Sequence, residues 1–581
     1  MIQRRTRPCT STRALTLAVA LSCAAGAASC DDDGNKTQAD AGAPAPLATT
    51  GDFYGEKVDK VIQLEQGWSA ADIEWFYTTT QGSELMPYAT FINLEQADST
   101  ELFRSPRNMS KYRYLTDFSS KDNPDGLPVG FVKNGESIGL TCATCHTNQV
   151  NYKGTGIRIE GGPTMADFGT FMRDLIAALD KTLKTPEKLE RFSAQVLGAG
   201  ASAEKKAELV KNLTSVHDEM AYADKVNTTG ASPYGFARLD AFGRIYNRAI
   251  TIADRTNANP ANAPASYPFL WDTSQHDYVQ WVGNAPNANV GELQRNIGEV
   301  IGVFGSITIP EKTATLGGYK SSINVKDLNE LAAKMRDLES PLWPEGVLGA
   351  IDKALAEKGA AIWGKECGSC HLPINRSDPK RVVRAQMYGL ELIKTDPTMA
   401  NNITSYKGKT GILEGRKELV ITGPVFGPEA PAIDILTNLV AGVLEANVAG
   451  DLAAEIQALR DKDGGKAPPK EGNFPTANPL LAYKARPLNG VWATAPFLHN
   501  GSVPTLYDLL LPPDQRPKKF FVGRREMDVK KVGFSTDQFE GGSGAFELDT
   551  SVTGNSNAGH EYGTALSDDD RWALIEYMKT L

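Results

Sequence analysis

The chain has 581 residues, of which 41% are hydrophobic and 23% charged, so it is long enough for two or more globular domains. Its 61 basic and 70 acidic residues give a formal net charge of −9 at pH 7, and no basic stripe interrupts this acidic excess. Composition and charge therefore argue against a nucleic-acid-binding protein.

The first 30 residues predict an export signal. Four arginines lie within the first 13 positions, and residues 14–29 form an apolar run that ends in small residues and is too short for a membrane span. Cys30 follows directly and resembles the lipid-bearing first residue of a lipoprotein, with ordinary cleavage nearby as the alternative. We expect a protein of the periplasm or cell envelope, lipid-anchored or else secreted. Residues 31–52, rich in Asp, Ala, Pro and Thr, predict a flexible linker.

Two C-x-x-C-H motifs use four of the seven cysteines. They consist of Cys142, Cys145 and His146, and of Cys367, Cys370 and His371. In an exported chain this motif is typical of covalent c-type haem attachment. Two thiols on one helical turn form thioethers with the vinyl groups of the porphyrin, and the histidine supplies an imidazole nitrogen to the iron. The sequence therefore predicts two covalently bound haem c groups.

Two other uses of these motifs explain less. A zinc site needs four nitrogen or sulfur ligands, and the two motifs that would share them lie 225 positions apart, at Cys142 and Cys367. A thioredoxin-like dithiol has no need of a following histidine in both copies.

Residues 165–225 carry charged and aliphatic residues at helical spacing, with breaks expected at GAGAS (198–202) and NLTS (212–215). Residues 257–290 are dense in Pro, Asn and aromatic residues and predict an ordered region of loops.

The segment before the second motif places Gly359, Trp363 and Cys367 at four-residue intervals, on one face of a helix. This spacing resembles the first helix of small c-type cytochromes, where a glycine lets another helix pass closely. The expected partner is residues 567–581, a helix capped by Ser567 with acidic residues in its first turn.

We predict a mostly α protein of two cytochrome c-like domains with long irregular insertions and little β structure. The sequence PLWPEG (341–346) breaks the chain near the junction, which gives domains over residues 53–338 and 339–581.

The sequence TAPFLHNGS around His499 resembles a signature of the bacterial di-haem cytochrome c peroxidase superfamily. Other stretches are similar to the peroxidase-like group within it that includes the secreted di-haem rubber oxygenases. These stretches are QGSELMPY (81–88), CHTNQVNYKGTGIRIEGGP (145–163), RNIGEVIGVFG (295–305) and SNAGHEYG (556–563). The resemblance covers roughly residues 60–581 and indicates no particular substrate.

The resemblance implies one six-coordinate haem that relays electrons and one haem with an open face for H2O2 or O2. The ordinary peroxidases place a ligating methionine after the signature histidine, where this chain has Pro513. We therefore expect His560, flanked by glycines that let a loop approach closely, as sixth ligand of the second haem. His499 is then a hydrogen-bonding neighbour of that haem, and the reverse assignment stays open.

The first haem is expected to be the reactive one, because no suggestive sixth ligand follows His146. By the resemblance, Glu299 is the candidate acid–base group for peroxide cleavage, with Arg295 assisting and Phe304 shaping the pocket. The alternative is a surface helix on which Glu299 is solvated. Trp271 and Trp281 are candidates for an aromatic bridge between the haems, with core packing as the competing interpretation.

We predict a peroxidase-type oxidoreductase that reduces H2O2 at the first haem with electrons from the second, supplied by a small redox protein or another donor. The alternatives are a dioxygenase that cleaves an apolar alkene such as polyisoprene, and a non-enzymatic carrier with two six-coordinate haems. A calcium ion between the domains and the oligomeric state are left open.

Overall fold

The computed structural model describes Tyr54 and residues 58–581, except positions 229, 312–317, 377, 379, 421, 448–470, 474–477, 479 and 539–545. The predicted signal and linker, residues 1–52, lie outside the described residues. Residues 45–581 form one compact unit, within which the division at residue 338 stays a prediction.

Helices dominate the secondary structure: 39% of the described residues are helical and 18% lie in strands. The strands form separate sheets of two or three members, and none of the sheets among these residues closes on itself. A mostly α fold with little β structure is therefore confirmed. Among the same residues, no helix combines the length and the apolar composition that crossing a membrane requires.

The first C-x-x-C-H motif lies between two sheets. Strand β4 (Ser137–Leu140) leads into the one-turn helix α4 (Cys142–Cys145), which carries both cysteines. A hairpin follows at once, formed by β5 (Thr147–Tyr152) and β6 (Thr155–Glu160), and β1 (Lys60–Gln63) pairs with β6 in parallel. The motif is thus held by strands on both sides, without a preceding helix.

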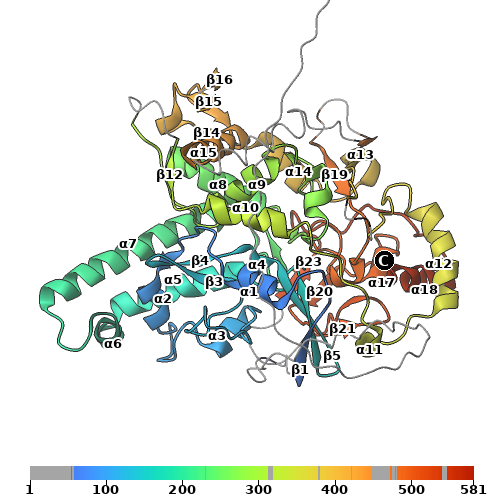
Figure 1. The fold of residues 1–581 in the computed structure, drawn as a ribbon, viewed down its shortest axis with the longest axis horizontal. Coiled ribbons are helices and arrows are strands. Elements are labelled where there is room, and N and C mark those ends of the chain that lie inside the picture. The colour runs from blue at the N-terminus through green and yellow to red at the C-terminus, as the bar shows by residue number, and fades with distance from the viewer. Residues whose placement is uncertain are drawn as a thin grey trace, which may run out of the picture. The chain divides into compact units, whose positions relative to one another are not determined.

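The hairpin is followed by the helical region that the sequence predicted, which consists of α5 (Phe168–Lys184), α6 (Pro186–Leu197) and α7 (Ala203–Thr228). Figure 1 shows the long helix α7 running beside α5, and α6 packs against both. The expected break at residues 198–202 is confirmed as the connection between α6 and α7.

The expected break at residues 212–215 is wrong, because α7 continues through them. The Thr214 hydroxyl donates a hydrogen bond to the Val210 carbonyl one turn earlier (2.8 Å). A threonine that bonds back to its own helix in this way need not interrupt it.

Helix α9 (Gly291–Gly302) carries Arg295 and Glu299 and packs against α8 (Ala241–Ala253), α10 (Val325–Lys334) and α15 (Ala432–Asn447). The preceding residues 257–290 contain only very short elements and are otherwise loops, as predicted.

The second motif follows helix α12 (Lys353–Glu366), which packs against the carboxy-terminal helix α18 (Asp568–Met578), as Figure 1 shows. A Cβ added at Gly359 would lie 1.9 Å from the carbonyl oxygen of Ala573, so only glycine allows this approach. The Ser567 side chain accepts a hydrogen bond from the backbone of Asp570 and caps α18 (3.2 Å). The predicted helix pair is confirmed.

A three-stranded sheet has the order β18 (Glu471–Asn473), β13 (Gln386–Gly389) and β19 (Ala482–Ala485). Strand β19 is antiparallel to β13 and leads into the segment around His499.

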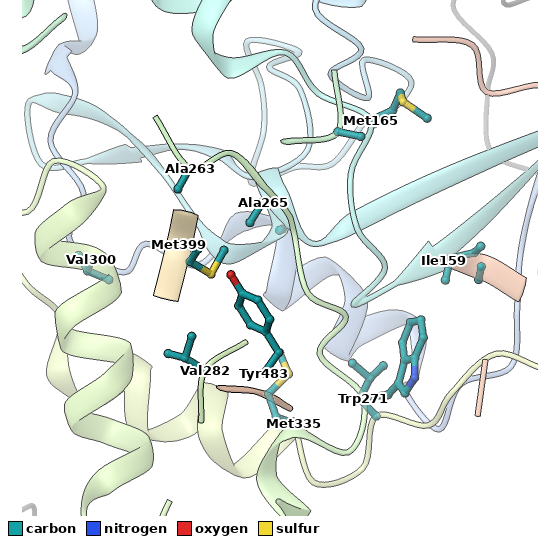
Figure 2. Packing of buried hydrophobic residues seen from close by; sticks show 14 of the residues in the cluster. Ile159, Met165, Ala263, Ala265, Trp271, Val282, Val300, Met335, Met399 and Tyr483 are labelled. Atoms are coloured by element: carbon teal, nitrogen blue, oxygen red, sulfur yellow. The ribbon is translucent and has the colours of Figure 1, made fainter. Parts of the chain in front are cut away.

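One buried cluster extends from Trp68 to Met578 and includes Trp271, Val282 and Tyr483, which come from separate parts of the sequence (Figure 2). A second cluster lies between residues 85 and 220, around helix α5.

The remaining described elements are short. The helices are α1 (Ala70–Thr78), α2 (Tyr88–Asn93), α3 (Pro106–Lys111), α11 (Glu345–Leu348), α13 (Leu390–Ile393), α14 (Thr398–Ser405), α17 (Leu506–Leu509), η1 (Thr273–Gln275), η2 (Gly411–Leu413) and η3 (Val491–Ala493). The strands are β2 (Met86–Pro87), β3 (Phe131–Asn134), β7 (Arg238–Leu239), β8 (Ala265–Ser266), β9 (Tyr278–Val279), β10 (Ala285–Pro286), β11 (Ile307–Thr308), β12 (Lys320–Ser321), β14 (Lys407–Lys409), β15 (Lys417–Leu419), β16 (Thr422–Val425), β17 (Glu429–Pro431), β20 (Lys519–Val522), β21 (Met527–Asp528), β22 (Gly533–Phe534) and β23 (Phe546–Asp549).

Candidate functional site: two cavities at the C-x-x-C-H motifs

A cavity of about 690 Å³, here called the first cavity, lies beside the first motif. Cys142 and His146 line it, and so do Arg295 and Glu299 of helix α9. The structure therefore brings together two of the predicted catalytic residues and the first predicted haem-binding motif, which lie about 150 positions apart in the sequence.

The Glu299 carboxylate belongs to a small polar group in this cavity. It accepts a hydrogen bond from Gln280 Nε2 (3.0 Å), and Arg295 Nε lies 3.7 Å from the same oxygen. Desolvation raises the pKa of Glu299 above its ordinary value, and the Arg295 charge and the Gln280 hydrogen bond oppose that shift. The side chain is 37% exposed, on a surface that lines the cavity.

Arg295 is held firmly in place. Its guanidinium donates to the side-chain oxygens of Asn287 (2.8 Å) and Asn296 (3.1 Å), and Glu292 Oε1 lies 3.9 Å away. The Arg295 side chain is only 9% exposed. Because its charge is fixed, it can stabilise negative charge on Glu299 or on a bound anion without reorganisation.

Phe304, the third predicted residue of this pocket, is not among the residues that line either cavity. It packs against the second buried cluster, with its ring 6.3 Å from that of Phe168. Its backbone has φ of +66°, just after helix α9 ends, and this turns the chain away from the helix direction.

His146 is the only histidine among the described residues that line the first cavity, and Met335 lines it as well. Burial lowers the pKa of His146 to about 4, so the imidazole is neutral, as a metal ligand must be. His217 pairs with Asp218 (2.9 Å), and His276 Nδ1 lies 2.7 Å from the Asp272 carbonyl oxygen. Neither of these two histidines lines the first cavity or the second cavity described below.

The second cavity, about 1480 Å³, lies beside the second motif. Its lining includes Cys367, Cys370, His371 and both candidate sixth ligands, His499 and His560. The contact of α12 with α18 brings the loop that precedes α18, and with it His560, close to the motif.

His371 and His560 face one another across this cavity. Their ring centroids lie 6.2 Å apart with the planes at 56°. With metal–imidazole bonds of about 2 Å, two rings at such a separation would have room to hold one metal atom between them. His371 Nδ1 lies 2.6 Å from the Arg486 carbonyl oxygen, which fixes the ring and leaves Nε2 as the ligating nitrogen.

The loop that carries His560 is fixed from two sides. A Cβ at Gly559 would lie 2.3 Å from the Ile393 carbonyl oxygen, so the glycine permits the close approach expected from the sequence. The buried guanidinium of Arg516 donates to the carbonyl oxygens of Asn557 (2.6 Å), Gly559 (2.8 Å) and His560 (3.1 Å). Arg516 therefore holds the loop against the cavity.

His499 lies elsewhere in the second cavity. Its ring stacks on Tyr483, with centroids 4.1 Å apart and planes at 23°, and meets Trp281 at 6.5 Å. Burial lowers the pKa of His499 to about 4. This geometry is consistent with His499 as a neighbour of the second site and His560 as the residue opposite His371.

A shared wall separates the two cavities. Five residues line both: Pro268, Phe269, Trp281, Lys484 and Arg486. Of the two predicted bridging tryptophans, Trp281 is thus in the wall. Trp271 lines neither cavity but stacks on Phe269, with centroids 4.5 Å apart, and donates to the Asn489 carbonyl (3.0 Å); Figure 2 shows it in the buried core.

The cysteines fit haem attachment better than a redox dithiol. No disulfide links any two of the four, and desolvation raises the pKa of Cys142, Cys145 and Cys367 to about 12, the reverse of an activated thiol. Among the described residues, no group of three or more His, Cys, Asp and Glu side chains is arranged to hold a metal ion directly, as a zinc site would require. Each of the two motifs borders a cavity, and burial lowers the pKa of His146 and of His371. Both sites therefore fit haem c attachment.

Four further residues at these cavities were not predicted from the sequence: Lys484, Arg486, Gln280 and Tyr483. One signal was available: residues 482–486, AYKAR, place two basic residues in alternation on a short apolar strand just before the His499 segment. Charges at inward-facing strand positions are rare unless they meet a partner.

Residues 482–521 match the family described as RoxA-like, cytochrome c-like. The chain is also 35% identical over 591 residues to the uncharacterized protein y4iJ of Sinorhizobium fredii (strain NBRC 101917 / NGR234), a match that covers 90% of this chain and 94% of the relative. The uncharacterized protein y4iM of the same strain is 26% identical over 383 residues, covering 60% and 73%.

The matched segment contains Lys484, Arg486 and His499, which the structure places at the shared wall and in the second cavity. A cytochrome c-like segment implies haem c as cofactor and indicates a haem-based oxidoreductase. The chain therefore belongs to the family of the Sinorhizobium fredii protein y4iJ, with a RoxA-like, cytochrome c-like segment at its second cavity.

Proposed function

We propose that this protein is an exported di-haem peroxidase that reduces H2O2 in the first cavity with electrons relayed through the second. The observation that carries the proposal is the difference across the two motifs: His146 shares its cavity with Glu299, whereas His371 faces His560. A haem c bound by a single histidine supplies an open coordination position and electrons for peroxide reduction.

The first-cavity residues supply the proton chemistry. Reduction of one H2O2 consumes two electrons and two protons and yields two water molecules. The Glu299 carboxylate accepts the proton from the near peroxide oxygen and returns it to the far oxygen, which leaves as water. Arg295, 3.7 Å from Glu299, stabilises the negative charge that develops as the O–O bond breaks. Because this transfer only moves a proton that H2O2 already carries, both protons that the reduction consumes come from solvent.

The shared wall supplies the path between the cavities. Trp281 and Phe269 line both, and Trp271 stacks on Phe269. Leu372, directly after His371, is 41% exposed, which supports electron entry from an external redox protein at the second motif. With the export signal, this is consistent with a periplasmic or envelope location and a lipid anchor at Cys30.

A dioxygenase is the second candidate function. The RoxA-like match favours it, as does the apolar part of the first cavity, where Leu270, Val279, Leu331 and Met335 would contact an alkene. The glutamate and guanidinium in the same cavity favour peroxide as the substrate.

The electronic and electron paramagnetic resonance spectra of the purified holoprotein test the proposal. We expect one high-spin and one low-spin ferric signal, with the high-spin signal lost on addition of H2O2, and two electrons consumed for each H2O2. Two low-spin haems without peroxide turnover would instead indicate an electron carrier. Oxygen uptake with polyisoprene, without peroxide consumption, would indicate the dioxygenase.

A further inference from the structure

The shared wall contains two buried basic side chains that form no ion pair with any described residue. Lys484 and Arg486 are 6% and 8% exposed and line both cavities. Lys484 lies in strand β19 and Arg486 follows directly after its last residue, Ala485.

The hydrogen bonds of these cations go to backbone carbonyl groups. Lys484 Nζ donates to the Tyr278 carbonyl and Arg486 Nη2 to the Phe269 carbonyl, both at 2.9 Å. The Arg486 guanidinium also lies 3.4 Å from the centroid of the Phe269 ring, and its Nε is buried without a partner. At least one N–H donor of Arg486, on Nε, is therefore available to a bound group.

The nearby carboxylates form their ion pairs with other arginines, although the Asp277 charge also acts on Lys484 and opposes the lowering of its pKa. Asp272 pairs with Arg381 (2.5 Å) and Asp277 with Arg384 (3.6 Å). Within the part of the chain that the structure describes, neither Lys484 nor Arg486 forms an ion pair. A buried cation is strongly unfavourable unless an anion or several hydrogen bonds compensate it, so the wall is built to receive anionic groups.

We propose that Lys484 and Arg486 form a carboxylate-binding site in the shared wall, which takes propionate groups of the haems in both cavities. This rests on the haem binding in the proposed function, but not on the peroxidase reaction. Both cations border both cavities, so one pair of charges is shared by two cofactors.

This arrangement couples the electrostatics of the two haems. A buried positive charge disfavours the oxidised haem, which carries one more positive charge than the reduced form, so it raises the reduction potential. Removing either cation is expected to lower the potentials of both haems together. A change confined to one haem would be the expectation for a cation that serves a single cavity.

Potentials measured by spectroelectrochemical titration of the holoproteins test the site. We expect Lys484→Met and Arg486→Met each to weaken reduction of both haems about tenfold, which corresponds to a potential about 59 mV lower for a one-electron couple. Arg238→Met is the matched control, since Arg238 is 1% exposed and bonded to carbonyl groups of Tyr234 and Asn500 but lines neither cavity. Its potentials are expected to stay at the wild-type values.

Resonance Raman bands of propionate bending report the contact directly and should shift in both methionine variants but not in the control. If Lys484→Met fails to retain haem, Lys484→Arg keeps the charge and moves its donors, so it must still shift these bands. Unchanged potentials and bands would overturn the proposal. So would bands that respond only to added phosphate or chloride, because the site would then take free anions. A holoprotein without peroxide turnover still gives both readouts, so the two proposals fail separately.

Discussion

The two cavities begin from the same five-residue pattern and differ in what the chain places across from it. The first motif shares its cavity with Glu299, a carboxylate that can accept and return a proton, and with Arg295, a cation that can stabilise negative charge. Opposite His371 lies a second imidazole, that of His560. The motif thus fixes where a cofactor attaches, and distant segments of the chain decide what chemistry each site supports.

The two sites also differ in how the far side is held. Glu299 lies on helix α9, which three other helices support. His560 lies on a loop that Arg516 and the backbone near Ile393 hold in place. A helix thus fixes the carboxylate of Glu299, whereas a loop that contains Gly559 brings the imidazole of His560 close to His371.

Removing one motif at a time should separate the two roles most completely. Cys142→Ser with Cys145→Ser should halve the haem content and abolish peroxide turnover. Cys367→Ser with Cys370→Ser should also halve the haem content but retain the open site, so that slow turnover with a small-molecule reductant persists. The pyridine haemochrome assay and peroxide consumption measure both. Turnover that survives loss of the first motif would reverse the assignment.

Replacing the acid–base group should have the next largest effect. Glu299→Gln is expected to lower kcat/KM for H2O2 by about 10²- to 10⁴-fold, the contribution of a positioned general base. Glu330→Gln on α10, a 46% exposed carboxylate that lines neither cavity, is the control and should keep the wild-type rate. A Glu299→Gln rate within a few-fold of wild type would leave the first cavity without its proposed base.

The pH profile should show the ionisation of Glu299. Desolvation raises its pKa above the ordinary value of about 4.3. The ionised form is the active base, so kcat/KM is expected to fall as the pH drops through this raised pKa. In Glu299→Gln this acidic limb should disappear. An identical limb in the variant would assign it to another group.

Replacing the far-side imidazole should make the second cavity more like the first. His560→Ala removes the ring that faces His371, so the low-spin ferric signal should become high-spin. His499→Ala should leave that signal low-spin, because His499 stacks on Tyr483 instead. Electron paramagnetic resonance spectra distinguish the two, and the opposite result would support the reverse ligand assignment.

Replacing the two tryptophans at the shared wall should have the smallest effect, a slower electron transfer between the haems. Trp281→Phe is expected to slow electron transfer between the haems several-fold, because Trp281 lines both cavities. Trp271→Phe should slow it less, since Trp271 reaches the wall only through Phe269. Flash reduction of the second haem, followed at the first, measures both rates. Equal rates in the two variants would exclude Trp281 as the main bridge.

Local patterns predicted much of this molecule. The spacing of Gly359, Trp363 and Cys367 predicted helix α12 and its contact with a second helix. A few consecutive residues suffice for this, because they show both the helical periodicity and the glycine that allows close packing. The positions of Glu299 and His560 relative to the motifs, together with the family resemblance, predicted that they lie near the haem sites. The structure places Glu299 in the first cavity and His560 in the second.

Long-range packing was not predictable in the same way. Phe304 is three residues beyond Ile301, yet its positive φ directs it to a different cluster. Lys484 and Arg486 reach both cavities only because β19 packs against residues 268–281, which are about 200 positions earlier in the sequence. The residues of the NLTS segment favour turns in isolation, which predicts a break, whereas packing of α7 against α5 keeps the segment helical.

The contact between α12 and α18 also bears on how the protein is made. Met578 lines the second cavity, and the Leu581 carbonyl accepts a hydrogen bond from Gly490 (3.1 Å). The second cavity therefore cannot close before helix α18 and the residues after it have been synthesised. Loss of this segment would leave the cavity open to solvent, however complete the preceding part of the chain.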